Sequence, residues 1–76
     1  MVVNIPKLGV SMTEGTVAQW LVDDGGRAEA GQPLYVLETD KVENEIDAPT
    51  SGTVRHLVGV GETLPVGTPI AEIAEG

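Results

Sequence analysis

The chain has 76 residues and a formal net charge of −8, with twelve acidic side chains against four lysines and arginines. A single domain of this size buries only about 60% of the surface that its unfolded chain exposes, so its core must be economical. The charge argues against binding to nucleic acid or to an anionic membrane, because both depend on clustered cations.

The chain contains no cysteine, so no disulfide or thiolate metal site holds the fold. It also has no basic start followed by a long apolar run. We therefore expect neither a signal peptide nor a transmembrane helix, and the sequence leaves a cleaved transit peptide open.

Short strands joined by turns are the predicted elements, because β-branched residues are abundant and glycines and prolines are spread along the chain. In chain order we expect strands near 2–6, 16–22, 33–39, 42–48, 53–58 and 69–74, and short strands near 27–29 and 63–64. We expect a longer loop over 8–15 and tight turns at glycines 25, 26, 59 and 61. The blurred alternation of "TVAQWLV" predicts a bulge or burial on both faces. No segment has the caps and the 3.6-residue period of a helix.

The two halves of the chain resemble each other. "GTVAQWL" from Gly15 matches "GTVRHLV" from Gly52, and after a one-residue shift "AGQP" matches "VGTP". On this alignment Gly31 is equivalent to Gly67, and we place Trp20 in the core opposite Leu57. Such a repeat predicts two copies of one unit that pack face to face. We therefore expect an all-β fold, a flattened β-barrel or sandwich of two antiparallel sheets with pseudo-two-fold symmetry.

One lysine lies inside the most acidic stretch, "LETDKVENEID". Asp40 and Lys41 fall between two consecutive predicted strands, so Lys41 is expected at a hairpin tip. Neighbouring carboxylates favour the charged ammonium, so a nucleophilic role is disfavoured. Two interpretations stay open: an ordinary solvated turn lysine, or a lysine that another enzyme modifies.

Three segments together resemble the lipoyl domains of 2-oxo acid dehydrogenase complexes: "IPKLGVSMTEGTVAQWL", "ETDKVENEIDAPTSGTV" and "VGVGETLPVGTPIAEI". The resemblance covers nearly the whole chain, so we expect one lipoyl domain over residues 1–76. It implies the barrel-sandwich hybrid fold and lipoic acid as a covalent amide on Lys41, with Asp40 and Val42 as the flanks of the motif. The alternatives are a biotinyl carrier domain, whose family flanks its lysine with methionines, and an unmodified interaction module of the same fold.

The resemblance implies a non-catalytic carrier domain of a dihydrolipoamide acyltransferase in a 2-oxo acid or acetoin dehydrogenase complex. Its modifying enzymes would be a lipoate–protein ligase, or an octanoyltransferase with lipoyl synthase. Its partners would be a thiamine-diphosphate-dependent decarboxylase, an acyltransferase core and a flavin-dependent dihydrolipoamide dehydrogenase. The expected compartment is the cytoplasm of a bacterium or archaeon, or the mitochondrial matrix for an excised eukaryotic domain. The residues that the resemblance implies for partner recognition are Leu8, Gly9, Val10, Ser11, Met12, Thr13, Glu14, Glu38, Thr39 and Glu43.

The remaining polar candidates favour structural roles. His56 is the only histidine, and acid–base catalysis needs a positioned partner that the sequence does not show. "VDDGG" lacks the spaced oxygen ligands of a calcium loop, so it predicts a turn. Glu43, Glu45 and Asp47 alternate with Val42, Asn44 and Ile46, which indicates either a solvated strand face or a surface that steers partners.

Overall fold

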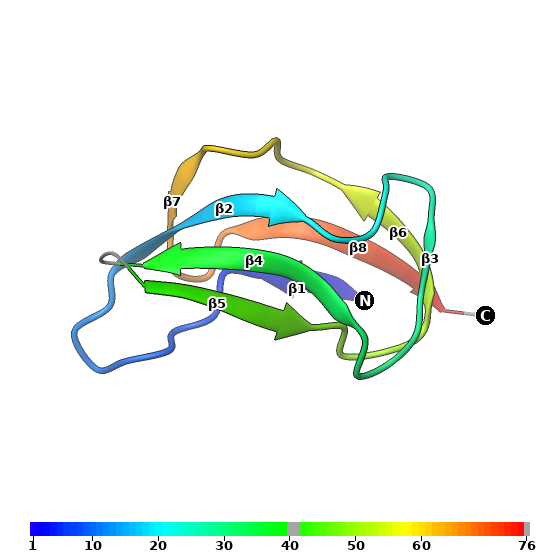
Figure 1. Cartoon of the computed structure of the whole chain (residues 1–76), viewed down its shortest axis with the longest axis horizontal. Helices are drawn as coiled ribbons and strands as arrows, with labels where there is room; N and C mark the ends of the chain where they lie inside the picture. The colour runs from blue at the N-terminus through cyan, green and yellow to red at the C-terminus, as the bar shows by residue number, and fades with distance from the viewer. Residues whose placement is uncertain (40–41, 76) are drawn as a thin grey trace.

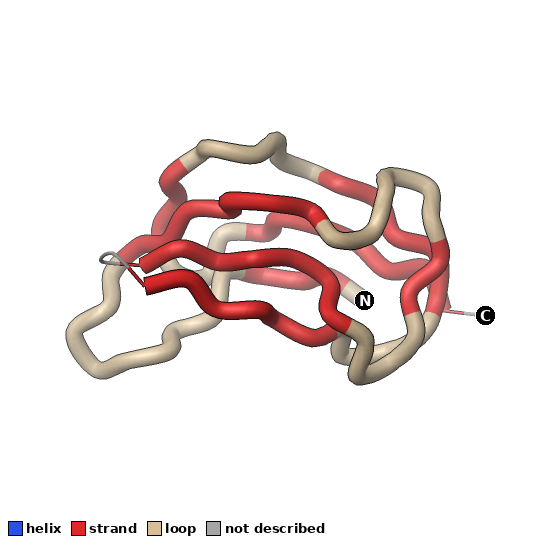
Figure 2. Tube along the Cα trace, in the orientation of Figure 1, coloured by secondary structure: helices blue, strands red, loops and turns tan. Residues whose placement is uncertain are grey.

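The computed structural model describes residues 1–39 and 42–75. These residues form eight strands, and each of the eight expected strands is confirmed within a few residues at its ends (Figure 1). The strands are β1 (Val2–Asn4), β2 (Glu14–Trp20), β3 (Arg27–Ala28), β4 (Pro33–Thr39), β5 (Val42–Asp47), β6 (Gly52–His56), β7 (Thr63–Pro65) and β8 (Pro69–Glu75). The described part contains no helix, and so none that could span a membrane (Figure 2).

The strands form two four-stranded antiparallel sheets, in the orders β1-β8-β6-β3 and β5-β4-β2-β7. The two sheets have equivalent strand orders. Strands β1, β8, β6 and β3 of the first sheet correspond, in that order, to β5, β4, β2 and β7 of the second. Each sheet thus takes two strands from each half of the chain, so neither half can bury its apolar face alone. The expected all-β fold is confirmed as a flattened sandwich, since the two sheets do not close into a barrel.

The core lies between the sheets and is built almost entirely of aliphatic side chains. Its buried members are Val3, Ile5, Val17, Val22, Ala28, Leu34, Tyr35, Leu37, Ala48, Val54, Ile70, Ala71 and Ile73. No polar or charged residue other than Tyr35 is buried in the described part. The acidic side chains of the described residues therefore leave this small core undisturbed, as a domain of this size requires.

Backbone hydrogen bonds repeat across the pseudo-two-fold axis. The N–H of Gly31 donates to Ala48 O at 2.9 Å, and the N–H of Gly67 donates to Ile5 O at 2.9 Å. Both glycines have positive φ, +86° and +91°, in a conformation that residues with a Cβ rarely adopt. The equivalence of the "AGQP" and "VGTP" turns is therefore confirmed down to individual bonds.

A bulge explains why the repeat shifts by one residue. Val17 pairs with Leu37 and Gln19 pairs with Val36, so Ala18 is an extra residue in β2. The paired strands β6 and β8 show no such shift. The bulge predicted in "TVAQWLV" is therefore confirmed.

The equivalence of Trp20 with Leu57 was wrong, because Trp20 lies beyond the extra residue. Once the bulge is counted, Trp20 corresponds to His56, and the two rings stack on each other with centroids 3.9 Å apart and planes 12° apart. The Trp20 Nε1–H donates to Val58 O at 3.2 Å, and His56 Nε2 lies 2.8 Å from Val22 O. A carbonyl only accepts, so His56 donates through Nε2. The stack joins the two halves across the axis and leaves Trp20 half-buried against the core.

Candidate functional site: the β4–β5 hairpin and the β1–β2 loop

The lysine hairpin has the predicted register. Strands β4 and β5 pair from Pro33 with Asp47 to Thr39 with Val42, so only two residues connect them. Those two residues, Asp40 and Lys41, lie outside the described part of the chain, as do the details of the predicted turn. Because Thr39 pairs with Val42, residues 40 and 41 are the connection between the two strands of the hairpin.

Acidic, exposed residues lie close to the hairpin tip on both strands. Glu38 pairs with Glu43 across the two strands, and both side chains are exposed. Two like charges placed directly opposite each other disfavour strand pairing, so stability alone does not select them. Glu45 and Asp47 are also exposed, which confirms the solvated face predicted for β5 and leaves a steering role open.

The β1–β2 loop lies at the same end of the molecule as the hairpin tip (Figures 1 and 2). Its form depends on Met12, whose N–H donates to Gly9 O at 3.1 Å and whose Sδ accepts from the Leu8 N–H at 3.2 Å. The Met12 side chain also packs against the core. The predicted loop over 8–15 ends two residues earlier than expected, because Glu14 and Gly15 pair with β7 and begin β2.

A groove of about 590 Å³ separates this loop from the hairpin. Its lining consists of Leu8, Gly9, Ser11, Met12, Thr13 and Glu14 from the loop side and Thr39, Val42 and Asn44 from the hairpin side. The structure thus brings most of the proposed recognition residues together around one depression. Val10, Glu38 and Glu43 do not line it, and Val10 is 96% exposed.

Asn44 is a groove residue that the sequence analysis did not select. It lies two positions from Val42 on β5, and alternate residues of a strand share one face. That alternation could have placed Asn44 beside Val42. It could not have shown that the β1–β2 loop lies against the same face.

The other polar candidates have structural partners. Asp24 Oδ1 accepts the His56 backbone N–H at 2.8 Å, and Gly26 N–H donates to Asp23 O at 2.8 Å, so "VDDGG" is a turn as predicted. No cluster of three or more possible metal ligands occurs within residues 1–39 and 42–75. His56 stacks and donates as described above, which is a structural role.

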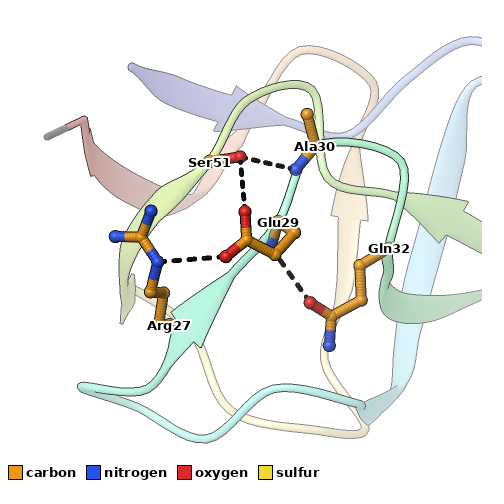
Figure 3. Close-up of polar contacts among 5 residues, drawn as sticks. All are labelled: Arg27, Glu29, Ala30, Gln32 and Ser51. Atoms are coloured by element: carbon orange, nitrogen blue, oxygen red, sulfur yellow. Dashed lines mark hydrogen bonds and ion pairs between the residues drawn. The ribbon is translucent and has the colours of Figure 1, made fainter.

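A polar cluster surrounds the turn after β3 (Figure 3), and β3 lies at the opposite end of the molecule from the end of β4 that leads into the lysine hairpin (Figure 1). Glu29 accepts from Arg27 Nε and from Ser51 Oγ, each at 3.1 Å, while Ser51 Oγ accepts from the Ala30 N–H at 2.8 Å. Gln32 Oε1 accepts from the Glu29 N–H at 3.0 Å. The bond from Arg27, the bond from Ser51 and the Arg27 charge lower the pKa of Glu29. These contacts join the turn after β3 to the segment before β6, which indicates a structural role.

Comparison with known proteins agrees with this geometry. The biotin/lipoyl family model, described as "Biotin-requiring enzyme", matches residues 1–73. The solution structure of the lipoyl domain of the 2-oxoglutarate dehydrogenase complex from Azotobacter vinelandii superposes with a TM-score of 0.77 at 26% identity. That superposition covers 100% of this chain and 99% of the other.

Three curated relatives are similar over much of this chain. The acetyltransferase component of the acetoin cleaving system of Cupriavidus necator is 49% identical over 82% of the chain. The acetyltransferase component of the pyruvate dehydrogenase complex of Corynebacterium glutamicum is 45% identical over 96%. The succinyltransferase component of the 2-oxoglutarate dehydrogenase complex of Bacillus subtilis is 43% identical over 97%. The matches span 17%, 11% and 18% of these relatives, respectively.

The chain belongs to the biotin/lipoyl attachment family, whose members are carrier domains and not catalysts. Within this family it is a lipoyl domain of the kind found in the acyltransferase components of 2-oxo acid dehydrogenase-type complexes.

Proposed function

We propose that Lys41 carries lipoic acid as an amide and that residues 1–76 act as a single swinging-arm carrier domain. The observation that supports this most is the register of the β4–β5 hairpin. Thr39 pairs with Val42, so only residues 40 and 41 connect the two strands. A hairpin end projects a side chain away from both sheets, where a modifying enzyme and several partner active sites can each reach it.

The chain itself supplies a rigid mount and a charged surface. The sandwich fixes the hairpin, and a tethered arm then meets each partner site at a high effective concentration. The exposed carboxylates of Glu38, Glu43 and Glu45 steer partners with basic surfaces, an effect that is strongest at low ionic strength. When bound, lipoic acid supplies a dithiolane that undergoes thiol–disulfide exchange and accepts an acyl group.

The partners follow from the same proposal. A lipoate–protein ligase, or an octanoyltransferase with lipoyl synthase, modifies Lys41. A thiamine-diphosphate-dependent decarboxylase, an acyltransferase core and a flavin-dependent dihydrolipoamide dehydrogenase use the arm. The relatives that carry this domain are acyltransferase components, which supports the same origin for this one. The proposed compartment is the cytoplasm of a bacterium or archaeon, or the mitochondrial matrix of a eukaryote.

Modification of isolated variants tests the proposal directly. Lys7 and Lys41 are the only two lysines, so Lys7→Arg is a matched control for Lys41→Arg. We expect a lipoate–protein ligase with lipoate and ATP to modify the parent and Lys7→Arg and to leave Lys41→Arg unchanged in intact mass. A lipoyl adduct on Lys41→Arg would contradict the assignment.

The same set of proteins tests the biotinyl alternative. Val42 stands beside Lys41 where a biotinyl domain has methionine, so we expect a biotin ligase to modify the parent far more slowly than a lipoate–protein ligase does. Parent protein that a biotin ligase modifies at the faster rate would reassign the cofactor.

A further inference from the structure

We propose that Met12 is an oxidation site and that its conversion to methionine sulfoxide releases the β1–β2 loop from the body of the domain. The oxidant is hydrogen peroxide, which is neutral, so the net charge of −8 does not repel it. The inference concerns the order of the loop, and it holds whether or not Lys41 carries a lipoyl group.

Met12 holds the loop through both its backbone and its side chain. Its N–H donates to Gly9 O at 3.1 Å, and its Sδ accepts from the Leu8 N–H at 3.2 Å. The side chain packs against the core. Its terminal methyl lies close to β2, since a Cβ at Gly15 would be 3.1 Å from Met12 Cε. Met12 therefore ties the loop to the sandwich.

The sulfur can be reached by a small oxidant although the side chain is half-buried. Met12 lines the groove between the loop and the hairpin, and the groove volume of about 590 Å³ is far larger than a peroxide molecule. A thioether carries no proton that must be lost before it reacts. Access therefore decides whether Met12 is oxidised.

The reaction transfers one oxygen atom. A lone pair of Met12 Sδ attacks one oxygen of hydrogen peroxide, so that an S–O bond forms and the O–O bond breaks. The leaving oxygen takes the proton that the transferred oxygen gives up, and it departs as water. The sulfur loses two electrons and the peroxide gains them.

The sulfoxide does not fit the place that the thioether occupies. Met12 Sδ and Leu8 N are 3.2 Å apart, and a hydrogen bond from N–H to oxygen takes up about 2.7–3.2 Å by itself. No room is left for an oxygen between the two atoms. An oxygen elsewhere on the sulfur gives a polar group to a side chain that packs against the apolar core, which favours its movement into water. In both cases Met12 moves outward and the Leu8 N–H loses its acceptor.

Release of the loop changes the surface beside the lysine hairpin. Loop residues 8–9 and 11–14 line one groove together with Thr39, Val42 and Asn44. A partner that contacts this end of the domain meets the ordered loop only while Met12 is reduced. Methionine sulfoxide reductases return the thioether, so the change is reversible.

Graded oxidation of the unmodified domain tests this inference. Met1 is the internal reference, because it is the only other methionine and is 55% exposed. Peptide mass spectrometry gives the extent of oxidation at each methionine along a hydrogen peroxide series, and nuclear magnetic resonance gives amide exchange rates in the same samples. We expect Met12 to be oxidised at a rate within about tenfold of the rate of Met1. Exchange of the Leu8 N–H should accelerate at least about threefold, in proportion to Met12 sulfoxide. The Val54 N–H, which donates to Gly26 O, should keep its rate.

Met12→Leu is the matched variant, because leucine keeps an apolar side chain of similar volume and has no sulfur. Peroxide should oxidise Met1 in this variant and leave the exchange of the Leu8 N–H unchanged. In the oxidised parent, a methionine sulfoxide reductase with a thiol reductant should restore the original rate. If Met12→Leu does not fold, the peroxide series on the parent, read separately at Met1 and Met12, decides the question.

Three outcomes would overturn the proposal. Met12 could stay reduced while Met1 is fully oxidised, which would mean that the sulfur is closed to the oxidant. Met12 sulfoxide could form without any change in the exchange of the Leu8 N–H. The exchange could also follow the oxidation of Met1 instead. None of these outcomes bears on the carrier function, because the test of Lys41 measures a different residue and a different reaction.

Discussion

Tyr35 is the one buried polar residue of the described core, and its hydroxyl has no hydrogen-bond partner there. Its ring fills the interior beside Trp20, with the ring centroids 5.6 Å apart. A buried hydroxyl without a partner loses its hydration and gains nothing in return. Burial also disfavours the phenolate and raises the pKa of Tyr35 to about 12.

We predict that Tyr35→Phe is at least as stable as the parent at pH 7, with a gain of up to about 1 kcal/mol in the free energy of unfolding. Phenylalanine keeps the ring and removes only the unpaired hydroxyl. Urea unfolding of the two proteins measures the difference. A variant less stable by more than about 1 kcal/mol would show that the hydroxyl has a stabilising partner, such as a buried water.

The same residue predicts an alkaline instability. The folded state holds the Tyr35 proton up to its raised pKa of about 12, while the unfolded chain releases it near the ordinary tyrosine pKa of 10.0. Between these values the folded state binds more protons, so the free energy of unfolding falls as pH rises. We expect this extra loss in the parent and not in Tyr35→Phe. Because Tyr35 is the only tyrosine, its absorbance titration gives the pKa directly.

At the scale of elements, some glycines stand where a side chain would strain the backbone or collide with a neighbouring strand. The positive φ at Gly31 and Gly67 predicts that Ala at either position costs on the order of 1 kcal/mol, although neither Cβ would meet an atom within 4 Å. At Gly52 a Cβ would lie only 2.2 Å from Ala74 O, so Gly52→Ala should cost clearly more. Gly9→Ala is the matched control, with open space and no positive φ, and should stay within about 0.5 kcal/mol. Thermal melts give the order, and equal melting of all four variants would refute it.

The lysine hairpin yields a prediction about position. Exchanging Asp40 and Lys41 keeps the composition and the charge but moves the lysine next to Thr39, which pairs with Val42 in the ladder. We expect a folded variant that loses most of its lipoylation, because side chains one residue apart point in different directions. Intact mass after the ligase reaction measures the loss. Circular dichroism must show a native spectrum, and a rate equal to that of the parent would contradict the idea.

The strands and the lysine hairpin could be predicted from sequence because their signals are local. Turn glycines, alternation and two adjoining strand segments fix the positions around Lys41 without any long-range contact. The role of Trp20 could not be read in this way. One extra residue at Ala18 moves every later equivalence by one position, and only the pairing with β4 shows where that residue lies.

The groove could not be predicted from the sequence, for a related reason. The side chains of the β1–β2 loop follow no period that predicts where the loop packs. Its position depends on Met12, which contacts both the core and the Leu8 N–H. Loop residues could be proposed for recognition by resemblance, but the inclusion of Asn44 required the folded chain.

At the scale of the molecule, the two halves meet at the stack of Trp20 on His56. We predict that the two residues are energetically coupled. A double-mutant cycle with Trp20→Leu, His56→Leu and the double variant should give a coupling of about 0.5–1.5 kcal/mol, typical of stacked aromatic pairs. Urea unfolding provides the four free energies. Additive losses would mean that the rings pack beside each other without a specific interaction.

The position of this stack makes Trp20 an intrinsic fluorescence probe of the fold. Trp20 is the only tryptophan, its ring lies on the His56 ring of the other half, and its indole N–H is held by Val58. Its emission therefore reports on the contact between the two halves as well as on the packing within its own half. If the domain unfolds in one cooperative step, the fluorescence transition coincides with the loss of strand signal in circular dichroism. If the stack of Trp20 on His56 opens before the strands melt, the fluorescence changes first.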